Sequence, residues 1–165
     1  MDNSVGKSTL LKLLFWGLGC EPELDTTWNA LDCKTIVDFE IDTKNYRVKR
    51  YKNQISLKEN DSIYKDFQKI TGKYSIKIAE IVNFKVLLPN QNSSILETHP
   101  PEFYFLPYYF DQKISWTKAW DNFNNLGQYS NWKSTFIKYH IGLLTPMHFE
   151  IESEKSSKKE NQKQI

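Results

Sequence analysis

The feature that most constrains the fold is the sequence GKST at residues 6–9, which an apolar segment follows at once. The pattern G-x-x-x-x-G-K-[ST] places a glycine-rich turn before a helix, so that backbone N–H groups at the helix start surround a phosphate. Met1 stands where the first glycine of that pattern would be. Leucines then recur with near-helical spacing until a glycine-rich stop, so the sequence predicts a helix over residues 7–17.

Each position of this motif has an expected role. The backbone cradle would be formed by Asn3, Ser4, Val5 and Gly6. The Lys7 ammonium would reach the β and γ phosphates, the Ser8 hydroxyl would bind Mg²⁺, and Thr9 would contact the α phosphate. The alternative is a chance glycine-lysine turn at a helix start, and the apolar helix that follows favours the nucleotide site.

Composition fits one globular domain. The chain has 165 residues, of which 39% are hydrophobic and 15% aromatic, and its net charge of +2 argues neither for nor against nucleic acid. It has no apolar run long enough for a membrane span and no signal-peptide pattern, so we expect a cytoplasmic protein without membrane contact. Cys20 and Cys33 lack metal-ligand spacing and are expected to be free or buried thiols.

Hydrophobic periodicity predicts the remaining elements. Three antiparallel strands in a meander are expected at residues 34–42, 45–51 and 54–58. Helices are expected at 60–71, 115–126 and 129–142, and residues 74–84 favour a short helix over a strand. Further strands are expected at 85–89 and 102–112, with a polar loop between them. The charged residues 150–165 are expected to be disordered or to open a long exposed helix.

The end of the aromatic run at 102–112 supplies a second candidate site. An apolar strand that ends in Asp111 could present a carboxylate to Mg²⁺, as in a small P-loop kinase. In the favoured alternative, Gln112 begins a loop, and its side-chain amide reaches Mg²⁺ and the attacking water. The acidic segment 35–40 lies in the meander and is expected to be only a strand.

Three segments in this order resemble a known family: DNSVGKSTLLKLLFWGLG, TIVDFEIDTKNYRVKRYKNQISL and FYFLPYYFDQKISW. Together they resemble the N-terminal half of an ABC-type ATPase head of the SMC, RecN and RecF group. Lys7 and Ser8 match its Walker A pair, and Gln112 matches its Q-loop glutamine. The segment LPYYFDQ-x3-W is most similar to SMC-like ATPases of bacterial anti-phage systems such as Lamassu.

The resemblance implies an α/β fold: a partial P-loop NTPase lobe with an antiparallel β meander and C-terminal helices. It implies a lobe over residues 1–150, its first strand missing, and a tail over 151–165 that is disordered or starts a truncated coiled coil. The family's signature motif, Walker B carboxylates, D-loop and switch histidine lie in its other half, so this chain is expected to be a piece cut from a longer protein.

The function that the resemblance implies is ATP binding. The intact parent would bind Mg-ATP between two heads, pair with a C-terminal lobe and act on DNA in repair, chromosome maintenance or phage defence. This chain alone is expected not to hydrolyse ATP. Two alternatives stay open: a degenerate fragment that binds no nucleotide and pairs with a separate C-terminal lobe, and the small P-loop kinase.

Other conspicuous side chains receive structural expectations. The resemblance makes Trp116, Trp120, Phe123 and Trp132 a packing layer rather than base-stacking platforms. The three histidines, His99, His140 and His148, are expected to be surface or packing residues. The basic residues Arg47, Lys49, Arg50 and Lys52 are expected on a solvated strand face, with a phosphate contact by Arg47 or Arg50 as the alternative.

Overall fold

The computed structural model describes residues 6–24, 27–28, 32–92, 96–111, 115–118 and 120–163. Its elements in chain order are α1 (Lys7–Gly17), β1 (Lys34–Ile41), β2 (Lys44–Tyr51), β3 (Gln54–Glu59), β4 (Lys65–Phe67), α2 (Lys73–Ile81), β5 (Leu87–Pro89), β6 (Leu96–Thr98), α3 (Glu102–Phe105), the 3-10 turns η2 (Leu106–Tyr108) and η3 (Leu126–Gln128), α4 (Trp132–His140) and α5 (Pro146–Lys163). The fold is mixed α/β with antiparallel sheets.

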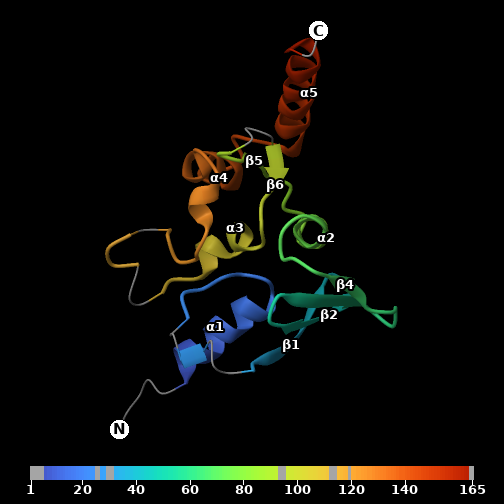
Figure 1. The fold of residues 1–165 in the computed structure, drawn as a ribbon, viewed down its shortest axis with the longest axis vertical. Helices are drawn as coiled ribbons and strands as arrows, with labels where there is room; N and C mark the ends of the chain where they lie inside the picture. The colour runs from blue at the N-terminus through green and yellow to red at the C-terminus, as the bar shows by residue number, and fades with distance from the viewer. Residues whose placement is uncertain are drawn as a thin grey trace.

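The elements are stacked along one long axis (Figure 1). Helix α1 and the sheet β1-β2-β3-β4 occupy one end, and α5 projects from the other end. Helix α3 lies between them, with α4 on one side and the small β5–β6 pair near the base of α5. Helix α1 therefore lies at the opposite end from the charged helix α5.

The meander forms because its strands alternate apolar and polar residues. Its register pairs Val37 with Val48 and Val48 with Leu57, which places these side chains on one face. That face packs on α2 in a cluster that includes Val48, Leu57 and the fully buried Tyr74. The three expected strands are confirmed to within a residue or two. The short helix expected within 74–84 is confirmed over Lys73–Ile81.

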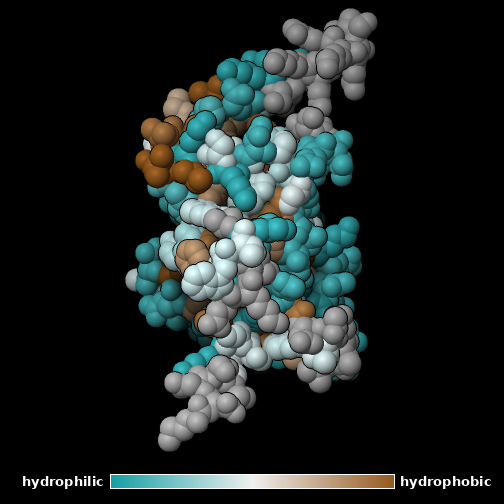
Figure 2. Space-filling view, turned by 90° about the vertical axis from the view of Figure 1, so that its left-hand side faces the viewer, coloured by the Kyte–Doolittle hydropathy of each residue, from teal (hydrophilic) through white to brown (hydrophobic). Residues whose placement is uncertain are grey.

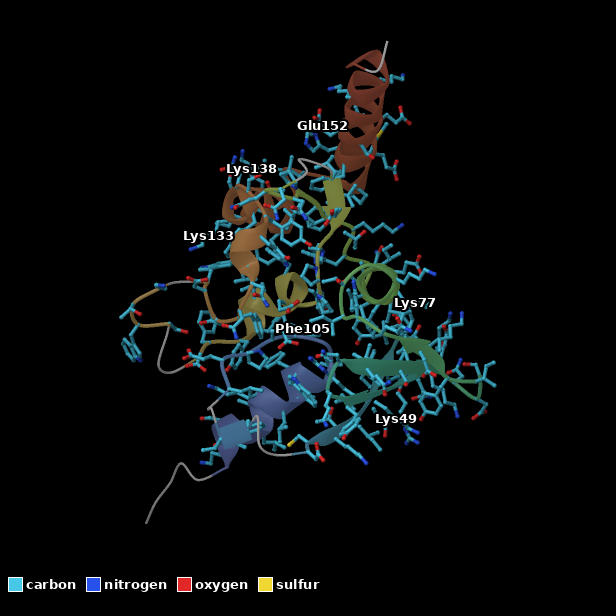
Figure 3. The ribbon with its side chains drawn as sticks, viewed as in Figure 1. Lys49, Lys77, Phe105, Lys133, Lys138 and Glu152 are labelled. Carbon is cyan, nitrogen blue, oxygen red and sulfur yellow. The ribbon has the colours of Figure 1, made fainter. Side chains whose placement is uncertain are left out.

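Helix α1 is confirmed at the expected residues 7–17 and packs closely on β1. A Cβ at Gly17 would lie 2.8 Å from both the Thr35 hydroxyl and a Val37 methyl, so only glycine allows this approach. On another side of the helix, the Phe15 ring lies 5.4 Å from Phe105 of α3, which is partly buried against the core (Figure 3).

A second, mostly aromatic core joins α1, α3 and α4. Its buried members are Phe15, Cys20, Phe84, Val86, Leu88, Phe103, Leu106, Tyr109, Phe123, Leu126, Tyr129, Trp132, Phe136 and Phe149. The expected packing roles of Phe123 and Trp132 are therefore confirmed, and Trp120 packs against the same core. The expectation for Trp116 is wrong, because its side chain is 87% exposed.

On the face that Figure 2 shows, hydrophobic side chains gather over α4 and the turn that follows it. The exposed residues there include Ile137, Ile141 and Leu143.

The predicted helix over residues 60–71 is wrong. Residues 65–67 form β4 instead, with Phe67 paired to Ile55 of β3. A strand edge presents unpaired N–H and C=O groups, and the pairing of β4 satisfies them. An isolated helix of this length has little stability of its own. The polar loop expected between residues 89 and 102 likewise contains β6, which pairs with β5, the strand expected at 85–89.

The predicted strand over 102–112 is also wrong in the residues that the structure describes. Residues 102–105 form helix α3, and 106–108 continue as a 3-10 turn. Pro101 at the N-cap has a φ of −56°, and Pro107 lies at the start of η2, so both prolines favour these turns. Extended backbone resumes at Tyr109, with φ −126° and ψ 119°.

The helix predicted over residues 115–126 does not form in the described residues of that range, and only Leu126 begins a 3-10 turn, η3. Trp120 and Asn125 have φ values of +68° and +65°, which a right-handed helix excludes. Helix α4 confirms the next predicted helix in part, over Trp132–His140. Helix α5 begins at Pro146 and runs through the charged residues as far as Lys163.

Within these described ranges, no helix has the length and apolar character that crossing a membrane requires.

Candidate functional site

The candidate phosphate site begins at Gly6, the N-cap of α1. Its φ of +98° lies in the left-handed region that a residue with a Cβ avoids. The first helical hydrogen bond runs from the Leu10 N–H to the Gly6 carbonyl at 2.9 Å. The backbone therefore turns sharply into the helix at the glycine of GKST, as the motif requires.

The first turn of α1 is open to a ligand. Lys7, Ser8 and Thr9 are all exposed. The N-cap makes no side-chain hydrogen bond, and the first turn carries no acidic residue. The N–H groups of a first helical turn have no partner within the helix, and the positive end of the helix dipole lies there, so this end favours an anion. The predicted cradle residues Asn3, Ser4 and Val5 lie outside the described residues.

Asp111 lies against the middle of α1. Its carboxylate is 4% exposed and pairs with the Lys12 ammonium at 2.8 Å, while the Tyr109 hydroxyl donates to it at 3.0 Å. Lys12 follows Ser8 by one helical turn, so both side chains project from the same side of α1. Gln112 comes directly after Asp111 and lies outside the described residues.

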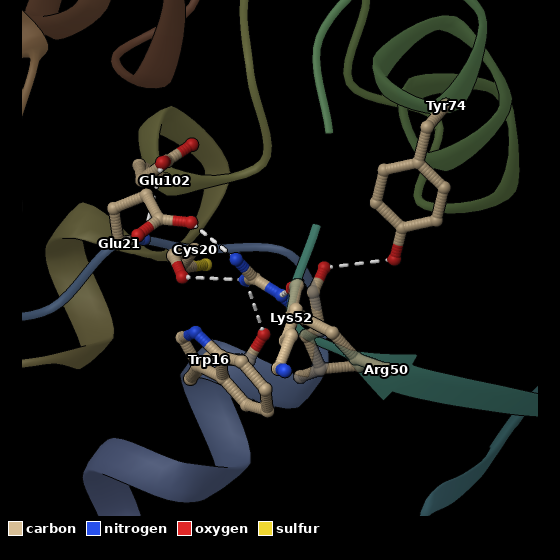
Figure 4. Close-up of polar contacts among 8 residues, drawn as sticks. Trp16, Cys20, Glu21, Arg50, Lys52, Tyr74 and Glu102 are labelled. Carbon is tan, nitrogen blue, oxygen red and sulfur yellow. Dashed lines mark hydrogen bonds and ion pairs between the residues drawn. The ribbon is translucent and has the colours of Figure 1, made fainter. Parts of the chain in front are cut away.

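Arg50 joins the sheet to the C-terminal end of α1 (Figure 4). Its guanidinium donates to the Trp16 carbonyl at 2.7 Å and to the Cys20 carbonyl at 3.1 Å, and it pairs with Glu21. It also lies 4.3 Å from the centre of the Trp16 ring. The guanidinium thus places a buried cation at the Trp16 carbonyl near the carboxyl end of α1, a favourable position in the helix dipole.

The expectation of a solvated strand face is wrong for Arg50, since its side chain is 3% exposed and its guanidinium is bound at the carboxyl end of α1. The burial of Arg50 could have been predicted from the alternation of residues along β2. Tyr46, Val48 and Arg50 alternate along β2, so the periodicity that buries the first two also turns Arg50 inward. Arg47, on the other face, pairs with the exposed Asp38.

A buried carboxyl group extends the Arg50 cluster. Glu102 at the start of α3 is 2% exposed and accepts a hydrogen bond from the Glu21 N–H at 3.1 Å. Burial, and to a lesser degree the neighbouring Glu21, raise the pKa of Glu102 to about 8. Burial likewise raises the pKa of the Cys20 thiol. Both cysteines are free thiols, as expected.

The histidines do not form a reactive site. His99 is buried among aromatic rings and contacts the Pro100 carbonyl at 2.8 Å, and burial lowers its pKa to about 4. His140 and His148 are exposed. Among the described residues, no three His, Cys, Asp or Glu side chains come together as a metal site would require.

Comparison with known proteins shows a distant likeness to a bacterial protein. No family model matches the chain, and no solved structure matches it. The chain is 27% identical over 143 residues to Lamassu protein LmuB of Bacillus cereus (strain VD014). The similar region covers 86% of this chain but 25% of that protein, so the chain spans about a quarter of the length of its relative.

Proposed function

We propose that this chain is the Mg-ATP-binding lobe of an SMC-like ATPase that acts in anti-phage defence. The observation that carries the proposal is the start of α1, where Gly6 at φ +98° leads into an uncapped helical turn that exposes Lys7 and Ser8. This backbone and these side chains suit a phosphate chain and its metal ion. The family resemblance specifies ATP.

The metal ion would be bound by Ser8, with Gln112 as the second contact. The position of Asp111 supports this pairing. Its carboxylate lies on the side of α1 that also carries Ser8, and the next residue in the chain is Gln112. The burial of Asp111 and its ion pair with Lys12 leave this carboxylate poorly placed as a metal ligand, which argues against the small-kinase alternative.

The defence role rests on the likeness to LmuB. Lamassu is an anti-phage system, and the similar region covers most of this chain. We extend to this chain the expectation that the whole protein acts on DNA through two ATPase heads. Because the region corresponds to a quarter of LmuB, the rest of the machinery would come from polypeptide beyond this lobe.

Exposed leucines on α1 support pairing with a further lobe. Leu10, Leu11 and Leu14 are 69%, 50% and 39% exposed, and helical spacing places them on one side of α1. Nearer its carboxyl end, α1 packs on the sheet through Gly17 and on the aromatic core through Phe15. Neighbouring apolar side chains that stay exposed mark a contact surface. We therefore propose that the C-terminal ATPase lobe covers these leucines.

A titration with a fluorescent ATP analogue in Mg²⁺ tests the function. We expect binding by the chain, a loss of at least about tenfold in affinity for Lys7→Ala, and no change for Lys138→Ala, an exposed lysine near the end of α4 (Figure 3). Ser8→Ala should weaken binding only when Mg²⁺ is present.

The other results discriminate among the alternatives. No binding by the wild-type chain would favour the non-nucleotide fragment. Phosphate transfer to a small acceptor, with Asp111→Asn more damaging than Gln112→Ala, would favour the kinase. ATP turnover by the 165-residue chain alone, abolished in Lys7→Ala, would contradict the proposal that hydrolysis needs a second lobe.

A further inference from the structure

Strand β1 is a long open edge of the main sheet. The strand order is β1-β2-β3-β4, so β1 pairs with β2 on one side and lies along the border of the sheet (Figure 1). Among the described strands, no other pairs with β1. An edge strand presents unpaired N–H and C=O groups, which are a template for a further strand.

The two edges of this sheet differ in how well they are protected. Strand β4, at the other edge, is three residues long and carries the charged Lys65 and Asp66, and short charged edges resist association. Strand β1 has eight residues, no proline and an uninterrupted alternation of exposure. Within residues 35–39 its one charged side chain is Asp38, which pairs with Arg47. Strand β1 therefore lacks the features that usually keep an edge from pairing.

The edge of β1 is complementary to a second copy of itself. A two-fold axis perpendicular to the sheet at Val37 sets two copies antiparallel, and each residue then lies opposite a residue of the same face. This places Lys34 of each copy opposite Glu40 of the other. Both side chains are exposed, and Glu40 makes no ion pair with another described residue. Two symmetric cross-strand ion pairs can therefore form.

The other positions of this register also match. On the exposed face, Ile36, which is 63% exposed, lies opposite Asp38, whose charge Arg47 already balances. On the packed face, the two Val37 side chains meet at the axis. Next to them, each Thr35 lies opposite Phe39 of the other copy. Pairs of β-branched and aromatic side chains are among those that stabilise neighbouring strands.

The neighbouring registers are less favourable. An axis at Asp38 would set the two Asp38 carboxylates opposite each other, and like charges in that position destabilise a sheet. An axis at Ile36 would set Glu40 opposite Asp32, another pair of like charges, and would shorten the paired segment. The sequence of β1 therefore favours the axis at Val37.

The carboxyl end of α1 does not extend beyond this edge. It packs on Thr35 and Val37 through Gly17. Arg50 of β2, which lies opposite Thr35 in the sheet, donates to the Trp16 carbonyl at 2.7 Å. This end of α1 therefore lies over β1 and β2.

We propose that the edge of β1 is a two-fold interface at which a second copy of this chain extends the sheet. The two copies pair antiparallel over residues 34–40, and the ion pairs between Lys34 and Glu40 fix the register. The first turn of α1 takes no part in this interface. The dimer therefore forms without nucleotide and does not depend on the Mg-ATP site proposed above.

Sedimentation equilibrium of the 165-residue chain over a range of concentrations, without nucleotide, tests the proposal. We expect a monomer–dimer equilibrium. Glu40→Lys sets an ammonium against Lys34 at two symmetric positions and should raise the Kd of the dimer at least about tenfold. Lys34→Glu should do the same. The double variant Lys34→Glu/Glu40→Lys should return Kd close to wild type, because it reverses both ion pairs without removing them.

A control and a cross-link make the test specific to this edge. Glu150→Lys changes an exposed glutamate on α5 and should leave Kd unchanged. In a Cys33→Ser background, a mixture of Lys34→Cys and Glu40→Cys chains treated with the oxidant diamide should form a disulfide dimer, because opposite Cβ atoms lie about 5 Å apart. Each cysteine variant alone should not, because identical positions lie about 20 Å apart along the strands.

The outcomes decide both the interface and its register. A wild-type chain that stays monomeric at every concentration would refute the interface, and so would a dimer whose Kd is the same in Glu40→Lys. A double variant that stays as weak as the single variants would refute the register, as would cross-linking of one cysteine variant with itself. Recovery by the double variant excludes misfolding as the cause of the single effects. Binding of the ATP analogue is measured separately, and its absence would refute the proposed function alone.

Discussion

Replacing Arg50 by methionine tests whether this residue holds helix α1 on the sheet. Methionine keeps the apolar stem but removes the guanidinium. The carbonyls of Trp16 and Cys20 would lose their donor, Glu21 would lose its cation, and the Trp16 ring would lose the group that stacks on it.

The expected cost follows from this geometry. Removing one partner of a buried ion pair typically costs about 3–5 kcal/mol, because the other groups remain without compensation. Glu21 is 28% exposed, so water can partly solvate its carboxylate after the change. We therefore expect a loss near the lower end, about 3 kcal/mol in the free energy of unfolding. For a chain of this size, that lowers Tm by about 6–12 °C.

Urea and thermal unfolding followed by circular dichroism measure this effect. Arg47→Met is the matched control, since Arg47 lies on the same strand but pairs with an exposed Asp38, and its midpoint should change little. The unfolding midpoint of Arg50→Lys should lie between those of wild type and Arg50→Met, because lysine keeps the charge but lacks the several donors of the guanidinium. Equal midpoints for Arg50→Met and Arg47→Met would refute the assignment of Arg50 as the buried anchor of α1.

Three further predictions concern single side chains. Folding raises the pKa of Glu102 from 4.5 to about 8, so between these pH values the folded chain holds a proton that the unfolded chain has released. The contribution of Glu102 to the free energy of unfolding should therefore fall as pH rises from 4.5 to 8. Glu102→Gln should remove that decline in Tm, and an unchanged pH profile would contradict the assignment. Gly17→Ala should lower the free energy of unfolding by about 1–3 kcal/mol in urea melts, because the added Cβ meets Thr35 and Val37 at 2.8 Å; wild-type stability would show that the helix shifts freely. Gly6→Ala meets no atom within 4 Å but must adopt φ +98°, so we expect about a tenfold weaker ATP-analogue affinity with little change in Tm. Equal affinity would show that this backbone conformation is not needed for binding.

Elements with a strong local pattern could be predicted from the sequence. The helix at 7–17 has apolar residues at helical spacing and a glycine at each end, and the meander alternates cleanly between turns. These signals lie within a few residues of one another, so no distant contact is needed to find them. The start of the candidate site was predictable for the same reason.

The wrong predictions concern segments whose structure depends on distant partners or on prolines. Residues 65–67 form a strand because they pair with the free edge of β3. The local sequence of these residues gives no information about that edge. The aromatic run after Pro101 has the composition of a strand. Proline fixes φ near the helical value, however, and the run forms a short helix and a 3-10 turn. The helix predicted over 115–126 is replaced by turns around Asn122. The buried amide of Asn122 donates to the Tyr109 carbonyl and accepts from the Ser115 hydroxyl, and such side-chain hydrogen bonds compete with helix formation.

The attachments of α1 divide the helix into a fixed part and a free part. Arg50 holds its carboxyl end and Asp111 holds its middle through Lys12, whereas the first turn is exposed and has no side-chain cap. Amide hydrogen exchange should therefore be slow near Phe15 and progressively faster toward Leu10. A phosphate bound at the amino end would slow exchange in the turn that is otherwise quickest to open, and its arrival could be followed amide by amide without any label on the nucleotide.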